Sequence, residues 1–297
     1  MENIQSLFIA LAALLWSSDS LFRFSLLKDL SPWAIVLGEH ILALVFVGPI
    51  LWRERMALLL LNKKQWWSVI FIGVGASALA TLAFTASFSY VGPSVAILLQ
   101  KTQPFFTFIL AWWWLKETLP KKFGWWAGLA IIGAYLVSFP EIIPQFNLYQ
   151  NGGWGIILAL VAAALWGSAT VFGRTLVNTL PYPLVTALRF IIALPVLVVL
   201  LFVYGGGISA YSGLSIQDLL YLIIIMLGPG WGAMYLYYKG LKFTRASISA
   251  ILELTWPVAA VILNWVFLDE KLMWVQIVGG LALILAASKL TVWKKEN

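Results

Sequence analysis

The chain of 297 residues is 62% hydrophobic and only 10% charged, with a mean hydropathy of +0.93 and a formal net charge of +7. This composition excludes an ordinary soluble domain and indicates a protein of the lipid bilayer, so we attribute the positive charge to the cytoplasmic leaflet and expect no nucleic-acid partner. With no cysteine and a single histidine, His40, the sequence excludes disulfides and a histidine metal cluster, and we expect neither a metal nor a cofactor.

Ten apolar segments follow one another, each about long enough to cross the hydrocarbon core as a helix. They lie approximately at 4–27, 32–52, 66–90, 93–115, 122–140, 153–178, 182–204, 217–240, 245–268 and 273–293. We read the first as a retained helix because no small-residue cleavage site follows it. The sequence predicts an all-α polytopic membrane protein with a five-helix repeat at 1–140, a periplasmic linker at 141–152 and a second five-helix repeat at 153–297.

Basic residues predict the orientation. Fourteen fall on the side shared by both termini and three on the other, which places both termini in the cytoplasm. The fourteen are Arg53, Arg55, Lys63, Lys64, Lys116, Lys121, Lys122, Arg174, Lys239, Lys242, Arg245, Lys289, Lys294 and Lys295; the three are Arg23, Lys28 and Lys271.

The two halves are related in sequence. "LAALLWSSDSLF" around Trp16 matches "VAAALWGSATVF" around Trp166. Five helices is an odd number, so the second copy enters the membrane from the opposite side, which is typical of alternating-access carriers. Helices 4 and 9 match through Thr102/Thr255, Pro104/Pro257, Trp112/Trp265 and Glu117/Glu270.

With its five-plus-five repeat, "ALLWSS" and "ALWGSA" opening the halves, and P-x₁₀-L-x-E at the ends of helices 4 and 9, the chain resembles EamA-type members of the drug/metabolite transporter superfamily. The resemblance implies a secondary transporter, and many such members are inner-membrane exporters of amino acids and other small metabolites. It also implies a central cavity lined mainly by helices 1, 3, 4, 6, 8 and 9.

Five ionisable residues lie well inside predicted spans: Asp19, Glu39, Lys101, Arg189 and Glu253. Each would cost about 2.5–3.5 kcal/mol at a helix centre, so they must face one another or water. We expect two roughly neutral clusters, one per half, with Lys101 paired to Asp19 or Glu39. The alternative is that buried ion pairs lock helices together without contacting a ligand.

Asp19 has a second possible partner, because Arg23 lies at the i,i+4 spacing that permits a pair. His40 has two interpretations, either a hydrogen bond to a neighbouring helix or a role in a proton relay. Pro104 and Pro257 each remove a backbone donor, so we expect helix kinks there that serve gating and face protein, water or solute.

We expect substrate-binding residues among these charges, at the matched tryptophans and on the aromatic stripes of helices 3 and 8, although such stripes usually indicate packing. The candidates are Trp16, Asp19, Glu39, Phe84, Gln100, Lys101, Trp166, Arg189, Trp231, Tyr235 and Glu253.

The predicted function is secondary-active or facilitative transport, most simply export of a zwitterionic metabolite such as an amino acid across the inner membrane by a monomer or homodimer. The alternatives are uptake of another small solute such as a vitamin, nucleotide derivative or sugar, and multidrug export. An enzyme is disfavoured because the sequence has no phosphate-binding loop and no metal-ligand pair. A channel is disfavoured by the inverted repeat with charge near the midplane.

Overall fold

The computed structural model describes residues 2–119, 121–139, 152–259, 262 and 273–292. Within these ranges the fold is built from helices and contains no strand, which confirms the all-α class. Among the described residues, seven helices are long and apolar enough to cross a membrane, and three shorter apolar helices accompany them, in agreement with the ten predicted spans.

The described part of the first half contains seven α-helices. They are α1 (Glu2–Trp16), α2 (Asp19–Leu26), α3 (Pro32–Glu54), α4 (Lys63–Ile70), α5 (Thr81–Gln100), α6 (Gln103–Trp114) and α7 (Phe123–Ser138). A 3₁₀ turn, η1 (Arg55–Leu60), follows α3, and a π-helix, η2 (Phe71–Ala80), joins α4 to α5.

The second half repeats this plan. Its helices are α8 (Gly152–Val177), α9 (Tyr182–Tyr204), α10 (Ile216–Ile225), α11 (Trp231–Leu241), α12 (Ala246–Glu253) and α14 (Trp274–Val292). The 3₁₀ turn η3 (Gly207–Tyr211) and the π-helix η4 (Met226–Gly230) lie where η1 and η2 lie in the first half. The predicted linker at 141–152 lies outside the described residues except for Gly152, which begins α8, and so do the predicted repeat partners Trp265 and Glu270.

Local breaks divide several spans. Gly92 interrupts α5 with φ 71° and is followed by Pro93, so span 3 ends and span 4 begins inside this helix, as predicted. Glycine adopts this positive φ without a steric penalty. Between α5 and α6 the chain turns at residues 101–102, and the matching turn after Glu253 falls at 254–255.

These turns change the interpretation of the two prolines. Pro104 lies in the first turn of α6 and Pro257 in the helical turn 256–259, so neither interrupts a continuous helix. A proline in a first turn removes a donor that would have no intrahelical partner. The expected kinks are therefore helix breaks located two or three residues before each proline.

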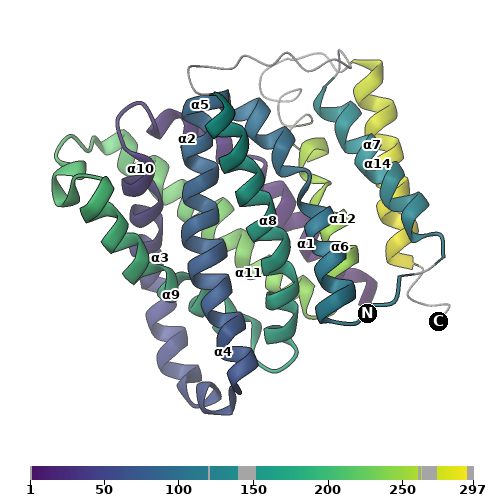
Figure 1. Cartoon of the computed structure of the whole chain (residues 1–297), viewed down its shortest axis with the longest axis horizontal. Helices are drawn as coiled ribbons and strands as arrows, with labels where there is room; N and C mark the ends of the chain where they lie inside the picture. Colours follow the sequence, from purple (N-terminus) through teal and green to yellow (C-terminus); the bar gives the residue numbers. More distant parts are fainter. Residues whose placement is uncertain (1, 120, 140–151, 260–261, 263–272, 293–297) are drawn as a thin grey trace.

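The packing of the two halves follows the repeat. The counterparts α7 and α14, and α3 and α9, lie against each other (Figure 1), and spans 4 and 9 meet through α6 and α12. The third span packs on the sixth through α5 and α8, and its counterpart, the eighth, packs on the first through α11 and α1. Equivalent positions 150 residues apart make the same contact: Gly155 lies against Tyr90, and Gln5, at the position of Gly155, lies against Gly240, at the position of Tyr90.

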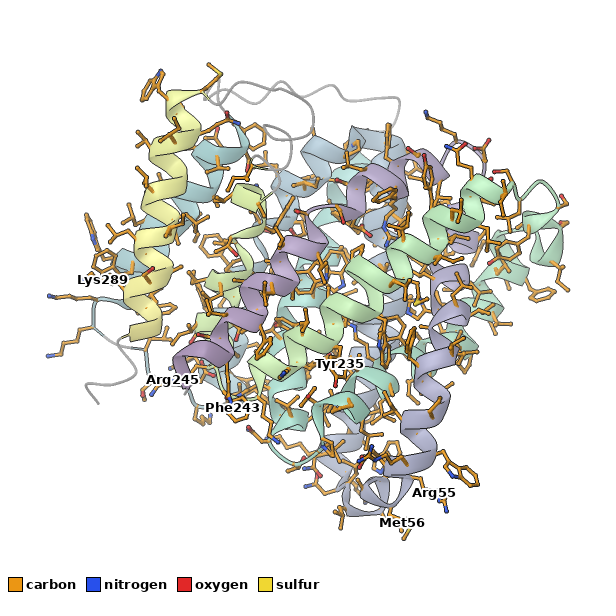
Figure 2. All side chains as sticks on the ribbon, turned by 180° about the vertical axis from the view of Figure 1, so that it is seen from behind. Arg55, Met56, Tyr235, Phe243, Arg245 and Lys289 are labelled. Carbon is orange, nitrogen blue, oxygen red and sulfur yellow. The ribbon has the colours of Figure 1, made fainter. Side chains whose placement is uncertain are left out.

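Both ends of the described chain lie on one side of the molecule, where α1 begins and α14 ends, which we call the terminal side (Figure 1). Figure 2 shows Arg245 and Arg55, two residues of the predicted basic side, along the lower edge of its view. The C-terminal ends of α3, α6, α8 and α11 share the terminal side because successive spans alternate in direction.

Candidate functional site

A cavity of about 170 Å³ lies where spans from both halves converge. Its wall is formed by residues of α1, α2, α3, η2, α5, α6, α8, α9, η4, α11 and α12, together with the turns after α5 and α12. The predicted site residues in this wall are Trp16, Asp19, Glu39, Phe84, Gln100, Lys101, Pro104, Trp166, Arg189 and Glu253. As far as the described residues go, the wall does not include Trp231, Tyr235 or Pro257.

Aromatic rings from both halves line the cavity. Phe84 meets Trp166 edge-on with ring centroids 5.1 Å apart, and Trp16 lies 5.4 Å from Tyr237. The indole of Trp166 donates to the carbonyl of Ala76 at 3.0 Å. Ala76 belongs to the π-helix η2, whose wider turn leaves carbonyls that side chains can use. Each half thus brings one of the matched tryptophans to the cavity, and the indole of Trp166 is held by this hydrogen bond.

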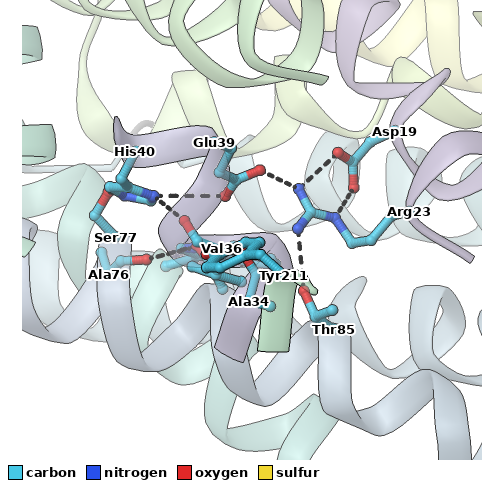
Figure 3. A network of polar contacts seen from close by, with 12 residues as sticks. Asp19, Arg23, Ala34, Val36, Glu39, His40, Ala76, Ser77, Thr85 and Tyr211 are labelled. Atoms are coloured by element: carbon cyan, nitrogen blue, oxygen red, sulfur yellow. Dashed lines mark hydrogen bonds and ion pairs between the residues drawn. The ribbon is translucent and has the colours of Figure 1, made fainter. Parts of the chain in front are cut away.

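A buried ionic triad occupies the first half (Figure 3). Arg23 donates to both carboxylate oxygens of Asp19, at 2.7 and 2.8 Å, and to Glu39 at 2.9 Å. Its remaining nitrogen donates to Thr85 at 3.1 Å. The side chains of Arg23 and Glu39 are each 5% exposed, and that of Asp19 is 15% exposed. One guanidinium therefore satisfies two carboxylates in a largely dry environment.

His40 extends this network along α3 (Figure 3). Its Nδ1 lies 2.7 Å from the carbonyl of Val36, which only accepts, so Nδ1 carries a proton and donates to it. In the neutral ring, Nε2 then accepts from the hydroxyl of Ser77, 2.8 Å away on η2. This geometry matches the first interpretation of His40, a hydrogen bond to a neighbouring helix.

The second half satisfies its acid differently. Glu253 accepts from the hydroxyl of Tyr237 at 2.7 Å and from the side-chain amide of Gln103 at 2.5 Å. The hydroxyl of Thr170 lies 3.5 Å from Glu253 and 2.8 Å from the hydroxyl of Tyr237. The side-chain amide of Gln100 donates in turn to the side-chain oxygen of Gln103 at 2.7 Å. Neutral donors from α6, α8 and α11 thus solvate this carboxylate.

The two remaining cations of the wall lack a direct acidic partner. Among the described residues, neither Arg189 nor Lys101 has a carboxylate oxygen within 4.0 Å. Arg189 donates to the hydroxyl of Tyr238 at 3.3 Å, and it interacts electrostatically with Glu253 over a longer range. The predicted second cluster is therefore held by hydrogen bonds rather than by a contact ion pair.

The predicted pairing of Lys101 with Asp19 or Glu39 is wrong. Lys101 donates to the hydroxyl of Ser138 on α7 and lies 5.0 Å from the ring of Trp256. Arg23 pairs with both Asp19 and Glu39, because it lies one helical turn from Asp19 and its planar guanidinium can bind two carboxylates at once.

Trp231 and Tyr235 lie behind the cavity wall. Trp231 packs between Phe46, with centroids 5.7 Å apart, and the cavity residue Phe190, at 5.5 Å. Tyr235 meets Tyr182 edge-on at 5.1 Å, in line with the packing interpretation of this stripe.

Sequence reasoning missed several wall residues: Arg23 as a site residue, Ser77, Thr81, Gln103, Thr170, Met234, Tyr237 and Trp256. On α11 the cavity face runs through Met234 and Tyr237, next to the predicted Trp231–Tyr235 face. The two faces have the same helical spacing, and only the phase set by η4 separates them. Arg23 could have been recognised as a site residue from its i,i+4 spacing to Asp19.

Comparison with known proteins gives a consistent result. The model of the EamA-like transporter family matches residues 3–139 and again residues 153–292. The chain is 28% identical over 292 residues to the riboflavin transporter ImpX of Fusobacterium nucleatum subsp. nucleatum, covering 96% of this chain and 97% of that one. It is 22% identical to the inner membrane transporter YhbE of Escherichia coli (strain K12), covering 82% of this chain and 75% of that one.

Similarity extends to a eukaryotic protein and to a solved structure. Solute carrier family 35 member G1 of Mus musculus is 27% identical and is aligned over 73% of this chain and 59% of its own. A protein crystal structure superposes with a TM-score of 0.76 over 99% of both chains at 16% identity, which establishes similarity of fold alone.

Proposed function

Because the chain belongs to the EamA-like transporter family, and is thus a multi-pass membrane transporter and not an enzyme, we propose that it carries a planar, aromatic, hydrogen-bonding solute, with riboflavin or a related flavin as the first candidate. The observation that carries this proposal is the wall of aromatic rings contributed by both halves. The similarity of the chain to ImpX, which is named a riboflavin transporter, supports the proposal independently.

The wall chemistry suits such a solute. Aromatic side chains offer a large stacking area, and a few polar groups between them fix the orientation of a ligand. Here Trp16, Phe84 and Trp166 provide rings, while Gln100 provides a hydrogen-bonding group at the same cavity. A flavin combines a flat ring system with polar edges and would use both kinds of group.

A solute bearing a carboxylate, such as an amino acid, is the second candidate. Lys101 and Arg189 favour it because both cations line the cavity without a contact acid among the described residues. The amine of a zwitterion would meet acids that are already engaged, since Asp19 and Glu39 share Arg23, and Glu253 accepts from Tyr237. This engagement makes the aromatic solute the stronger proposal.

Counterflow distinguishes the two candidates. Purified protein in liposomes loaded with unlabelled riboflavin is expected to accumulate labelled riboflavin in a saturable manner. Excess riboflavin should compete, and excess phenylalanine should not. The conservative change Trp166→Phe removes a cavity indole and should slow exchange, whereas Trp231→Phe changes a ring behind the wall and serves as the matched control. Exchange of amino acids but not of riboflavin would overturn the proposal.

For the topology, the proposal is a carrier of the inner membrane in which segments 1–140 and 153–297 are the two inverted repeats and both termini are cytoplasmic. A single chain encloses the cavity, so one chain would suffice for transport. Single cysteines replacing Lys28 and Lys63, both exposed, should react with an impermeant reagent from opposite sides of the membrane. Labelling of Lys63→Cys from the periplasm of intact cells would reverse the orientation.

A further inference from the structure

Outside the cavity, one carboxylate ties the first half to the second on the terminal side. Glu117, which follows α6, accepts from the backbone N–H of Ala246 at 2.8 Å and of Ser247 at 3.2 Å. It also accepts from the hydroxyl of Ser247 at 2.7 Å. Arg245, at the N-cap of α12, makes no side-chain capping bond, so the cap of this helix comes from the other half.

The backbone before Glu117 is strained. Lys116 has φ 56°, and among the described residues it is the one non-glycine residue with positive φ. The N–H groups of Leu115 and Glu117 both donate to the carbonyl of Ala111, at 3.1 and 3.2 Å, which completes a tight helix end with Lys116 at its left-handed position. Such a conformation persists only where surrounding contacts hold it. This turn directs Glu117 toward α12.

Two arginines strengthen the same junction. Arg174, near the end of α8, donates to the carbonyl of Leu241 at 2.6 Å and to that of Lys242, at the end of α11. Arg245 donates to the carbonyl of Thr118 at 3.3 Å. The terminal-side ends of α6, α8, α11 and α12 are thereby bound into one set.

This set lies next to the terminal-side end of the cavity, which we call its floor. On α8, α11 and α12, a cavity residue lies one helical turn from a residue of the junction: Thr170 from Arg174, Tyr237 from Leu241, and Ala250 from Ala246. Ala111, Val171 and Ala246 form a fully buried cluster beneath the cavity. The cavity is therefore closed toward the terminal side by packed helices that Glu117 holds together.

We propose that Glu117 is the latch of the terminal-side gate. An alternating-access carrier must open its cavity to each side in turn, and opening here requires the end of α6 to leave the start of α12. Glu117 then releases the first turn of α12, and Lys116 is free to leave its strained conformation. The closed state is thus held by charge-assisted hydrogen bonds against backbone strain, so removing the carboxylate shifts the population toward the open state.

The test needs no knowledge of the solute. Because the chain has no cysteine, Ala250→Cys reports access to the cavity floor through alkylation by an impermeant maleimide. Adding Glu117→Ala should raise the labelling rate from the terminal side by about tenfold and leave the rate from the other side unchanged or lower. Glu117→Gln and Ser247→Ala, which keep part of the capping set, should raise it less.

Two further variants make the test specific. Lys116→Gly adopts positive φ without strain, so it should favour the closed state and lower the terminal-side rate. Asp218→Asn is the matched control, because Asp218 is also a capping carboxylate but serves its own helix α10 in a capping box with Ser215. It should leave the labelling rate unchanged.

The proposal is wrong if Cys labelling at position 250 is no faster in folded Glu117 variants than in Ala250→Cys alone, if both sides become equally accessible, or if Asp218→Asn has the same effect. Monodispersity and a melting transition identify the folded variants. If Glu117→Ala does not fold, Glu117→Gln and Ser247→Ala decide the outcome. Failure of riboflavin counterflow would leave this result unaffected, since labelling is measured without solute.

Discussion

The two halves of the molecule hold their buried acids in different ways. In the first, Asp19 and Glu39 share the guanidinium of Arg23 at 2.7–2.9 Å. In the second, Glu253 is surrounded by neutral donors, and Arg189, at the repeat position of Glu39, makes no contact ion pair among the described residues. The same fold thus carries one half whose acids are satisfied by a cation and one whose acid is satisfied by neutral donors.

The largest expected effect breaks the first arrangement. Arg23→Leu leaves two buried carboxylates without their cation and should cost about 3–5 kcal/mol of stability. Thermal unfolding in detergent measures this loss. Arg53→Leu is the control, because Arg53 forms a 3.5 Å pair with Glu54 but is 85% exposed, and such a surface pair contributes about 0–1 kcal/mol. Equal losses in the two variants would mean that the triad contributes nothing special.

The second prediction concerns Glu253. Glu253→Ala leaves the donors of Tyr237 and Gln103 unmatched and should cost about 1–3 kcal/mol, which is less than the loss of Arg23. Counterflow of the solute should fall strongly in the protein that remains folded, because Glu253 lines the cavity. The contrast between the halves would disappear if Glu253→Ala lost as much stability as Arg23→Leu and kept full transport.

A third prediction tests which cation serves the first half. A double-mutant cycle between Lys101 and Asp19 should be additive within about 0.5 kcal/mol, because Lys101 contacts Ser138 and Trp256 instead. The cycle between Arg23 and Glu39 should show a coupling of about 0.5–3 kcal/mol. Coupling of Lys101 to Asp19 in folded variants would restore the pairing predicted from sequence.

The smallest effects come from two tyrosines on α11 that differ in the face they present. Tyr237→Phe removes a 2.7 Å hydrogen bond to Glu253 and should cost about 0.5–1.5 kcal/mol and reduce solute exchange. Tyr235→Phe removes only a 3.4 Å contact with the hydroxyl of Tyr182, so stability should change by about 0.5 kcal/mol or less and exchange should be unchanged. Reversed effects on exchange would place the cavity face of α11 on Tyr235.

The architecture could be predicted from the sequence because it depends on period and repeat. The length of the apolar segments follows from the thickness of the bilayer, and the matching motifs at Trp16 and Trp166 indicate the second five-helix repeat. Most candidate wall residues were also recognisable, since a charge such as Lys101 or Glu253 inside a span must face something polar.

The partners of these charges could not be predicted, for physical reasons. Three acids and three bases lie around one cavity, and their pairing depends on how the helices that carry them are rotated toward it. Sequence spacing suggested the local pair of Arg23 with Asp19 but gave no sign that Arg23 would also reach Glu39. Likewise, the π-helix η4 sets the phase of α11, and without it the faces of Tyr235 and Tyr237 are equivalent.

Helices of the first half pack mainly on helices of the second half, and this has a consequence for biosynthesis. The main neighbour of α1 is α11 and that of α5 is α8, so helices made early must wait in the bilayer for partners made late. The ionic triad is complete within the first seventh of the chain, since Asp19, Arg23 and Glu39 all lie on α2 and α3. The nascent first half can therefore neutralise these charges during insertion, whereas Gln103 finds Glu253 only after the ninth span has entered the membrane.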